Sequence, residues 1–180
     1  MMNDLMSGKV PVGGPFTLKD ADGRRRSLAE WRGKVVLLYF GYARCPDVCP
    51  TDLALIGQLL RELGPDAAQV QPLFVTLDPR RDKPGVMREY VAAFHPSFVA
   101  LTGSEAQIRR VATAYKVFYE KVPLPGSNAR VRSTDTYTID HAAFTFLLDR
   151  QGRYVGIFPP GTPTDRMAVM VREQLVAGKN

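Results

Sequence analysis

The fold is decided by residues 35–50, VVLLYFGYARCPDVCP. The run from Val35 to Phe40 is continuously apolar, which is typical of a strand buried on both faces of a sheet. The only two cysteines of the chain, Cys45 and Cys49, follow directly, and an amphipathic stretch from Leu53 to Leu63 comes next. We therefore expect a buried strand that delivers two thiols to a turn at the start of a helix.

The spacing of Cys45 and Cys49 places both thiols at one chemical site. Four residues of helix rise about 6 Å, or about one turn, so both sulfur atoms project from one side. This arrangement suits a disulfide, a redox-active pair or a shared soft metal ion. A purely structural disulfide is the weakest reading, because a loop this short stabilises the fold by only about 2 kcal/mol. A chain of 180 residues also buries an adequate core without such a bridge.

Further strands and helices are predicted to alternate along the rest of the chain. The first predicted elements are a hairpin at 15–28, a helix that starts at Pro50 or Thr51 and ends at Gly64, a strand at 70–77, a helix at 84–94 and a strand at 98–101. A helix from the capping box of Ser104 and Gln107 to about 115, an extended segment at 117–122 and a polar loop at 123–135 follow. The last elements are a hairpin of strands 144–148 and 154–158 and a helix at 165–177 capped by Thr164. This order predicts an α/β fold of the thioredoxin-like kind, in which helices flank a central mixed sheet. The hairpin at the N-terminus and the loop before His141 are additions to it.

The length and composition indicate one globular domain. We expect residues 15–178 to form this domain and residues 1–14 to be disordered or unrelated to it. No apolar stretch approaches the roughly 20 residues needed to span a bilayer, and the first residues lack the features of a signal peptide. The protein is therefore expected either to be cytoplasmic or to have lost a leader or anchor.

The formal net charge is +6, and nucleic acid is the first partner that such a charge suggests. The basic residues are scattered, however, apart from Arg24, Arg25 and Arg26, and no nucleic-acid-binding motif accompanies them. We therefore expect no nucleic-acid partner. The positive surface is expected to be either solvated or used to steer an acidic protein partner.

The chain has two histidines, His95 and His141. His95 stands before a proline at the end of a predicted helix, where a surface imidazole is ordinary. His141 lies at the entrance to a predicted buried strand. Together with Cys45 and Cys49 it makes a set of two thiolates and one imidazole, which suits copper as Cu(I) or Cu(II). A closed zinc site normally requires a fourth strong ligand and is less favoured.

Three segments together resemble the Sco/SenC family of copper-handling proteins. The segments are YFGYARCPDVCP at 39–50, VTLDPRRDKP at 75–84 and YTIDH at 137–141, and the similarity runs from about Pro15 to Gly161. The resemblance implies a thioredoxin-like fold with one copper ion per chain, bound by Cys45, Cys49 and His141. Asp78 ends a predicted strand and is either an outer-shell carboxylate of this site or an ordinary Asp-Pro turn residue.

The resemblance also implies a role in cytochrome c oxidase assembly. Relatives help to build the dinuclear copper centre of subunit II, and an N-terminal helix binds them to a membrane with the domain in the periplasm or intermembrane space. By this resemblance we expect the periplasm as the location and a membrane segment that this sequence does not include. Other copper carriers and thiol-disulfide reductases are the further expected partners. The main alternative is that Cys45 and Cys49 form a redox-active pair that keeps the partner's cysteines reduced, in which case His141 is dispensable. We favour the metallochaperone over the oxidoreductase.

Overall fold

A computed structural model describes residues 11–44, 48–123, 137–141 and 143–178. The strands and helices are β1 (Thr17–Asp20), β2 (Arg25–Ser27), β3 (Val35–Gly41), α2 (Val48–Leu63), β4 (Val70–Thr76), α3 (Pro84–Ala92), β5 (Val99–Thr102), α4 (Glu105–Ala114), β6 (Tyr119–Pro123), β7 (Tyr137–His141), β8 (Thr145–Leu148), β9 (Tyr154–Phe158) and α5 (Thr164–Ala177). Two short 3-10 helices add Leu28–Trp31 and Gly64–Gln69.

Within the described residues, seven strands form one mixed sheet in the order β2-β1-β5-β4-β3-β8-β9. The three central strands β3, β4 and β5 run parallel, and the flanking pairs are antiparallel. All residues of β3 and of β4 are buried, as their continuous apolar runs predict. The predicted mixed sheet and its N-terminal hairpin, β1 with β2, are confirmed.

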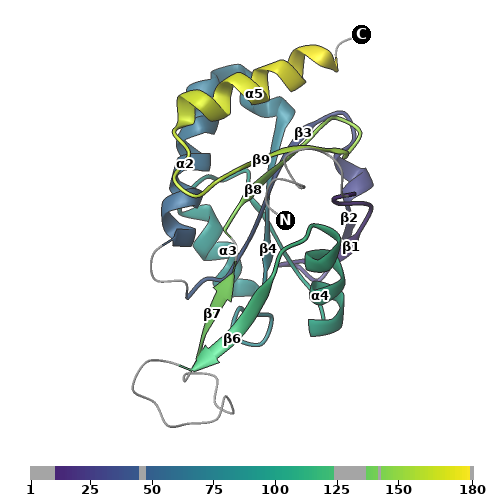
Figure 1. Cartoon of the computed structure of the whole chain (residues 1–180), viewed down its shortest axis with the longest axis vertical. Helices are drawn as coiled ribbons and strands as arrows, with labels where there is room; N and C mark the ends of the chain where they lie inside the picture. The colour runs from purple at the N-terminus through teal and green to yellow at the C-terminus, as the bar shows by residue number, and fades with distance from the viewer. Residues whose placement is uncertain (1–10, 45–47, 124–136, 142, 179–180) are drawn as a thin grey trace.

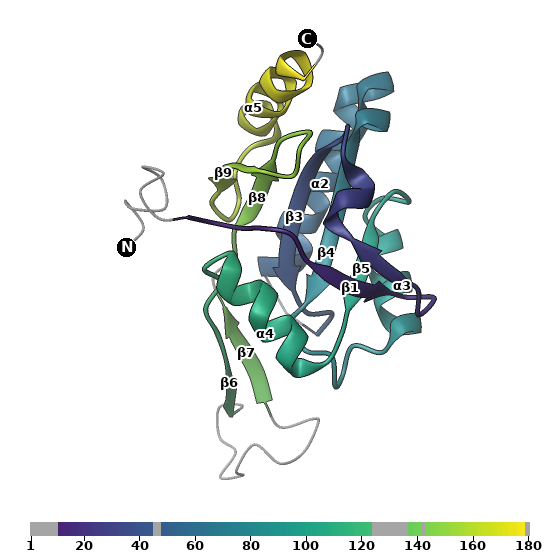
Figure 2. The same cartoon turned by 90° about the vertical axis from the view of Figure 1, so that its right-hand side faces the viewer.

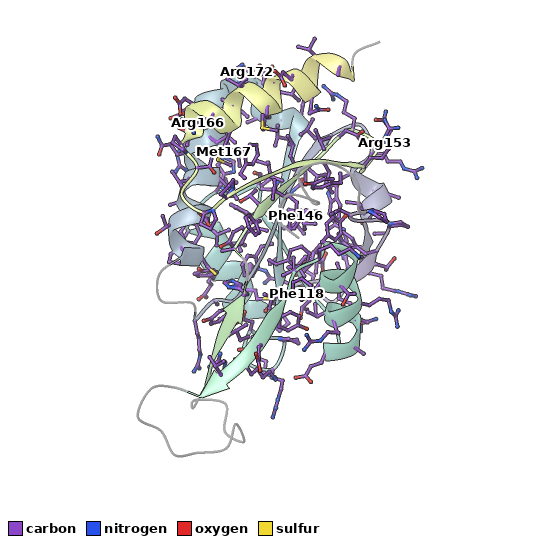
Figure 3. All side chains as sticks on the ribbon, viewed as in Figure 1. Phe118, Phe146, Arg153, Arg166, Met167 and Arg172 are labelled. Atoms are coloured by element: carbon purple, nitrogen blue, oxygen red, sulfur yellow. The ribbon has the colours of Figure 1, made fainter. Side chains whose placement is uncertain are left out.

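Helices cover both faces of this sheet (Figure 1). On one face, α2 packs against α5, and Tyr90 of α3 contacts Phe74 of β4 at a centroid distance of 5.9 Å. On the other face, next to α4, Tyr115 packs against Phe40 at 5.7 Å and Phe146 at 5.4 Å. Figure 3 shows Phe146 in the middle of the molecule. This layering gives β3 two differently packed faces, and the α2 face carries the thiol of Cys49.

A second sheet contains the strand that carries His141. Its strands, β6 and β7, form an antiparallel pair that projects beyond the main sheet (Figure 2). The sequence predicts an extended segment at 117–122 but no strand at 137–141, so β7 was missed. The loop predicted at 123–135 lies almost wholly outside the described residues. Tyr119 pairs with His141 itself, so this small sheet fixes the position of the imidazole along the chain.

Two predicted helix starts are wrong. Helix α2 begins at Val48 rather than at Pro50 or Thr51, because a proline in the first turn needs no hydrogen-bonded N–H. Helix α5 begins at Thr164 with Pro163 as its N-cap and no side-chain cap. The capping box of Ser104 and Gln107 is confirmed. Across the part of the chain that the structure describes, no helix has the length and apolar composition to cross a membrane.

Candidate metal centre

The structure brings two of the three predicted ligands together. Cys49 lies in the first turn of α2, and His141 is the last residue of β7. The Sγ atom of Cys49 lies 3.3 Å from Nε2 of His141, although 92 residues separate them in the sequence. Cys49 is fully buried and His141 is half-buried. The thiol of Cys49 is therefore enclosed by protein, whereas the imidazole of His141 is partly open to solvent.

The distance between these two atoms suits a shared metal ion. Bonds of about 2.0–2.3 Å to imidazole and thiolate, meeting at about 90–120°, place two ligand atoms about 3.0–3.7 Å apart. Cys45, the third predicted ligand, lies outside the described residues. Among the residues that are described, no group of three or more His, Cys, Asp or Glu side chains is arranged to hold a metal. The described part of the site is thus a Cys49–His141 pair.

Gly41 makes room for the sulfur atom. It ends β3, and a Cβ atom added there would lie 3.0 Å from Sγ of Cys49, 3.0 Å from the ring of Tyr39 and 3.2 Å from the ring of Phe74. Contacts of 3.0–3.4 Å are tighter than nine in ten real Cβ contacts, so the neighbouring atoms would have to shift by a few tenths of an ångström. A side chain at position 41 would therefore press on the thiol of Cys49 and on the two rings, and would require them to shift.

Tyr39 and Asp52 form a buried hydrogen-bond network near the thiol of Cys49. The hydroxyl of Tyr39 donates to Oδ2 of Asp52 at 3.2 Å, and the amide of Gly161 donates to Oδ1 of the same carboxyl group at 2.8 Å. Burial raises the pKa of Tyr39, and the charge of Cys49 adds to the effect. Burial also raises the pKa of Asp52, against the hydrogen bonds from Gly161 and Tyr39. The thiol is thus backed by two groups that favour their neutral forms.

Tyr42 connects His141 to the end of β3. Its ring packs edge-on against the imidazole with a centroid distance of 5.7 Å. Its hydroxyl accepts a hydrogen bond of 3.3 Å from the amide of Ile139, two residues before His141 in β7. Tyr42 is buried. One side chain therefore contacts both the backbone of β7 and the ring that this strand carries.

Asp78 is linked to the ring of Tyr42 through Arg81. The carboxylate of Asp78 is fully buried and pairs with the guanidinium of Arg81. The same guanidinium lies over the ring of Tyr42, 5.9 Å from its centroid. The segment after β4 therefore supports the ring that packs on His141. The outer-shell role expected for Asp78 remains a prediction.

Asp82 supports the residues that precede the cysteines. Its Oδ2 atom accepts hydrogen bonds from the amide of Ala43 at 2.9 Å and from the hydroxyl of Thr76 at 2.8 Å. Its Oδ1 atom is buried and has no hydrogen-bond partner among the described residues. Burial raises the pKa of Asp82, and the nearby charge of Asp78 acts in the same direction.

Sequence reasoning did not single out Gly41, Tyr42 or Asp82. All three lie inside the quoted segments 39–50 and 75–84. The only signal of their role is that they surround Cys45, Cys49 and Asp78 in the sequence. His95 lies beyond the end of α3, and its Nδ1 atom accepts a hydrogen bond of 3.1 Å from the backbone amide of Ser97.

The chain is similar to proteins of one known family. The model of the SCO1/SenC family matches residues 5–176. A SCO2-like protein of Rickettsia prowazekii is 40% identical over 155 residues, which cover 86% of this chain and 73% of that protein. The structure of Bradyrhizobium japonicum ScoI with copper bound is 39% identical, with a TM-score of 0.80, and the match covers 91% of this chain and 99% of the other.

A more distant structure, BsSco, is described as a member of the Sco family of cytochrome c oxidase assembly proteins in which a disulfide switch was identified. It is 22% identical, with a TM-score of 0.68 over 91% of this chain and 92% of the other, and so supports the fold alone. The thioredoxin-like α/β fold predicted from the sequence is confirmed by these neighbours. On the family match, the identity to the Rickettsia protein and the paired Cys49 and His141, this chain belongs to the SCO1/SenC family.

Proposed function

We propose that this protein binds one copper ion through Cys45, Cys49 and His141. The observation that carries the proposal is the 3.3 Å separation of Sγ of Cys49 and Nε2 of His141. Thiolates favour Cu(I), and the added imidazole also suits Cu(II). The copper bound to the Bradyrhizobium relative supports the choice of metal. Copper is here the cargo, and the partly open imidazole is the ligand from which transfer would begin.

The receiving partner is proposed to be cytochrome c oxidase, and within it the dinuclear copper centre of subunit II. Membership of the family supports an oxidase-related role, and the donor set supports a carrier that releases its metal rather than a closed structural site. The expected place of action is the periplasm, with residues 15–178 as the folded domain tethered to the inner membrane by a preceding segment.

Oxidation of the two cysteines would prevent copper binding at this site. A disulfide between Cys45 and Cys49 removes both thiolate ligands, so metal binding and redox state are coupled. Of the three proposed ligands only His141 is then left, and one imidazole does not hold copper by itself. Prior oxidation is expected to abolish tight copper binding, and an unaltered affinity would contradict this coupling.

The second candidate function is thiol-disulfide exchange with the partner. A thiolate attacks the partner's disulfide, a mixed disulfide forms, and the second cysteine resolves it, so that the partner is reduced as the pair is oxidised. The position of Cys49 in the first turn of α2 favours its thiolate. Because Cys49 is fully buried, the first attack would fall to Cys45.

Native mass spectrometry tests the proposed copper ligands. We expect reduced wild type exposed to copper without oxygen to carry one copper ion, and Cys45→Ala, Cys49→Ala and His141→Ala each to lose most of it. A His141→Ala protein that keeps its copper, together with Cys variants that lose it, would remove His141 from the proposed ligand set. Retained oxidase assembly in a His141→Ala strain would favour the thiol-disulfide function. Circular dichroism of each variant controls for loss of fold.

A further inference from the structure

A groove with a basic rim lies between the β1–β2 hairpin and α4. Its volume is about 510 Å³, and Figure 2 shows β1 and α4 side by side. Gln107, Arg110 and Ala114 line it from α4, where spacings of three and four residues put them on one helix face. Lys19 and Arg25 line it from the hairpin, and no acidic residue is found among the described residues that line it.

The positive side chains of this rim repel one another in the protein alone. Lys19 lies directly opposite Arg25 across the antiparallel strands, and both side chains are exposed. Like charges at directly opposite positions destabilise a strand pair. Arg110 adds a third exposed positive charge from α4. Within the described part of the chain, none of the three forms an ion pair.

The carboxylates of the hairpin are engaged elsewhere. Asp20 and Glu30 both pair with Arg26, at 3.1 Å and 3.0 Å. Asp22 pairs with Arg88 of α3. The run of three arginines noted in the sequence is therefore divided, because Arg26 is neutralised within the fold while its neighbour Arg25 faces the groove. The hairpin carboxylates Asp20, Asp22 and Glu30 thus leave the three cations of the groove open to an acidic partner.

We propose that this groove binds an acidic, extended segment of a partner protein. Charge complementarity selects the acidic side chains, and the apolar lining, which includes Pro15 and Ala114, suits the apolar side chains between them. Single-stranded nucleic acid is a poorer match, since it binds by base stacking on accessible aromatic rings. The aromatic residues of the lining, Phe16 and Tyr115, are only 8% and 1% exposed. This docking surface does not depend on copper binding.

The test uses a short fluorescein-labelled peptide in which glutamate and leucine alternate, with a lysine-leucine peptide as the control probe. Fluorescence anisotropy is measured with wild type and with Lys19→Gln, Arg25→Gln, Arg110→Gln and the triple variant. The matched control is Arg166→Gln, because Arg166 is an exposed arginine on α5, away from α4 (Figure 3). Every substituted residue is exposed, so stability should change little.

We expect wild type to bind the acidic peptide in preference to the basic one, with an affinity that falls as salt is added. Each groove substitution should weaken binding about threefold, and the triple substitution about thirtyfold if the sites act additively. The Arg166→Gln protein should bind like wild type. Copper titration of the triple variant should be unchanged, which separates this proposal from the metal site.

Three results would overturn the proposal. The first is that the triple variant binds the acidic peptide as tightly as wild type. The second is that Arg166→Gln weakens binding as much as a groove substitution, which would show an effect of overall charge. Displacement of the peptide by an equal concentration of oligothymidylate would assign the groove to nucleic acid instead.

Discussion

Replacing Tyr42 by phenylalanine should loosen the attachment of β7 without removing a metal ligand. The change deletes the hydroxyl that accepts the 3.3 Å hydrogen bond from the amide of Ile139 and keeps the ring that packs on His141. A buried hydrogen bond of this kind is worth about 1 kcal/mol, which corresponds to a factor of about five in the local opening equilibrium. The apparent copper affinity should fall by at most the same factor, because only the positioned fraction of His141 binds.

Amide hydrogen exchange measures this opening directly in the metal-free protein. The Ile139 amide should exchange about fivefold faster in Tyr42→Phe than in wild type. Tyr115→Phe is the matched control, since Tyr115 is equally buried and its hydroxyl donates one bond, of 3.4 Å, to the carbonyl of Gly14 on the other face of the sheet. Unchanged exchange at Ile139 in Tyr42→Phe, or equal acceleration in the control, would refute the reasoning.

Three further predictions follow from the site. Gly41→Ala should lower the unfolding free energy by about 1–3 kcal/mol and weaken copper binding by displacing Cys49. The control is Gly85→Ala, where an added Cβ meets nothing within 4 Å, and it should change neither stability nor copper binding. Calorimetry measures the stability of the two variants, and copper titration measures their affinity. Burial raises the pKa of Asp82 above 3.8, so the contribution of this carboxyl group to stability is present at low pH and is lost as the pH rises through the raised pKa. The unfolding free energy of Asp82→Asn, measured with denaturant, should therefore depend less on pH than that of wild type. The variant should show no loss of stability at pH 7. Free copper at about 100 times its Kd should raise the unfolding free energy by about 2.7 kcal/mol, and chelation should reverse the increase; a melting temperature that copper leaves unchanged would contradict specific binding.

The elements nearest the cysteines were the most predictable from sequence. Strands β3 and β4 are continuous apolar runs, and their burial in the centre of the sheet follows from composition alone. The ligand set was inferred from the donor chemistry and the family resemblance, and the structure places Cys49 and His141 in contact. Cys45 still rests on sequence, because it lies outside the described residues.

Features that depend on contacts between distant segments were not predictable. Strand β7 was missed because its pairing partner, β6, is a separate segment that local periodicity does not connect to it. The roles of Tyr42 and Asp82 depend on side chains that meet only after β3, β4 and β7 are assembled. The start of α5 was misplaced because Thr164 and Pro163 are both acceptable N-terminal residues, and local preference does not choose between them.

The most direct test of the copper site compares the Cu(II) electron paramagnetic resonance spectrum and affinity of wild type with those of His141→Ala. The imidazole nitrogen beside Sγ of Cys49 should contribute hyperfine coupling to the wild-type spectrum, and its removal should change the spectrum and weaken binding. Identical spectra and affinities would show that His141, despite its 3.3 Å contact with Cys49, does not bind the metal.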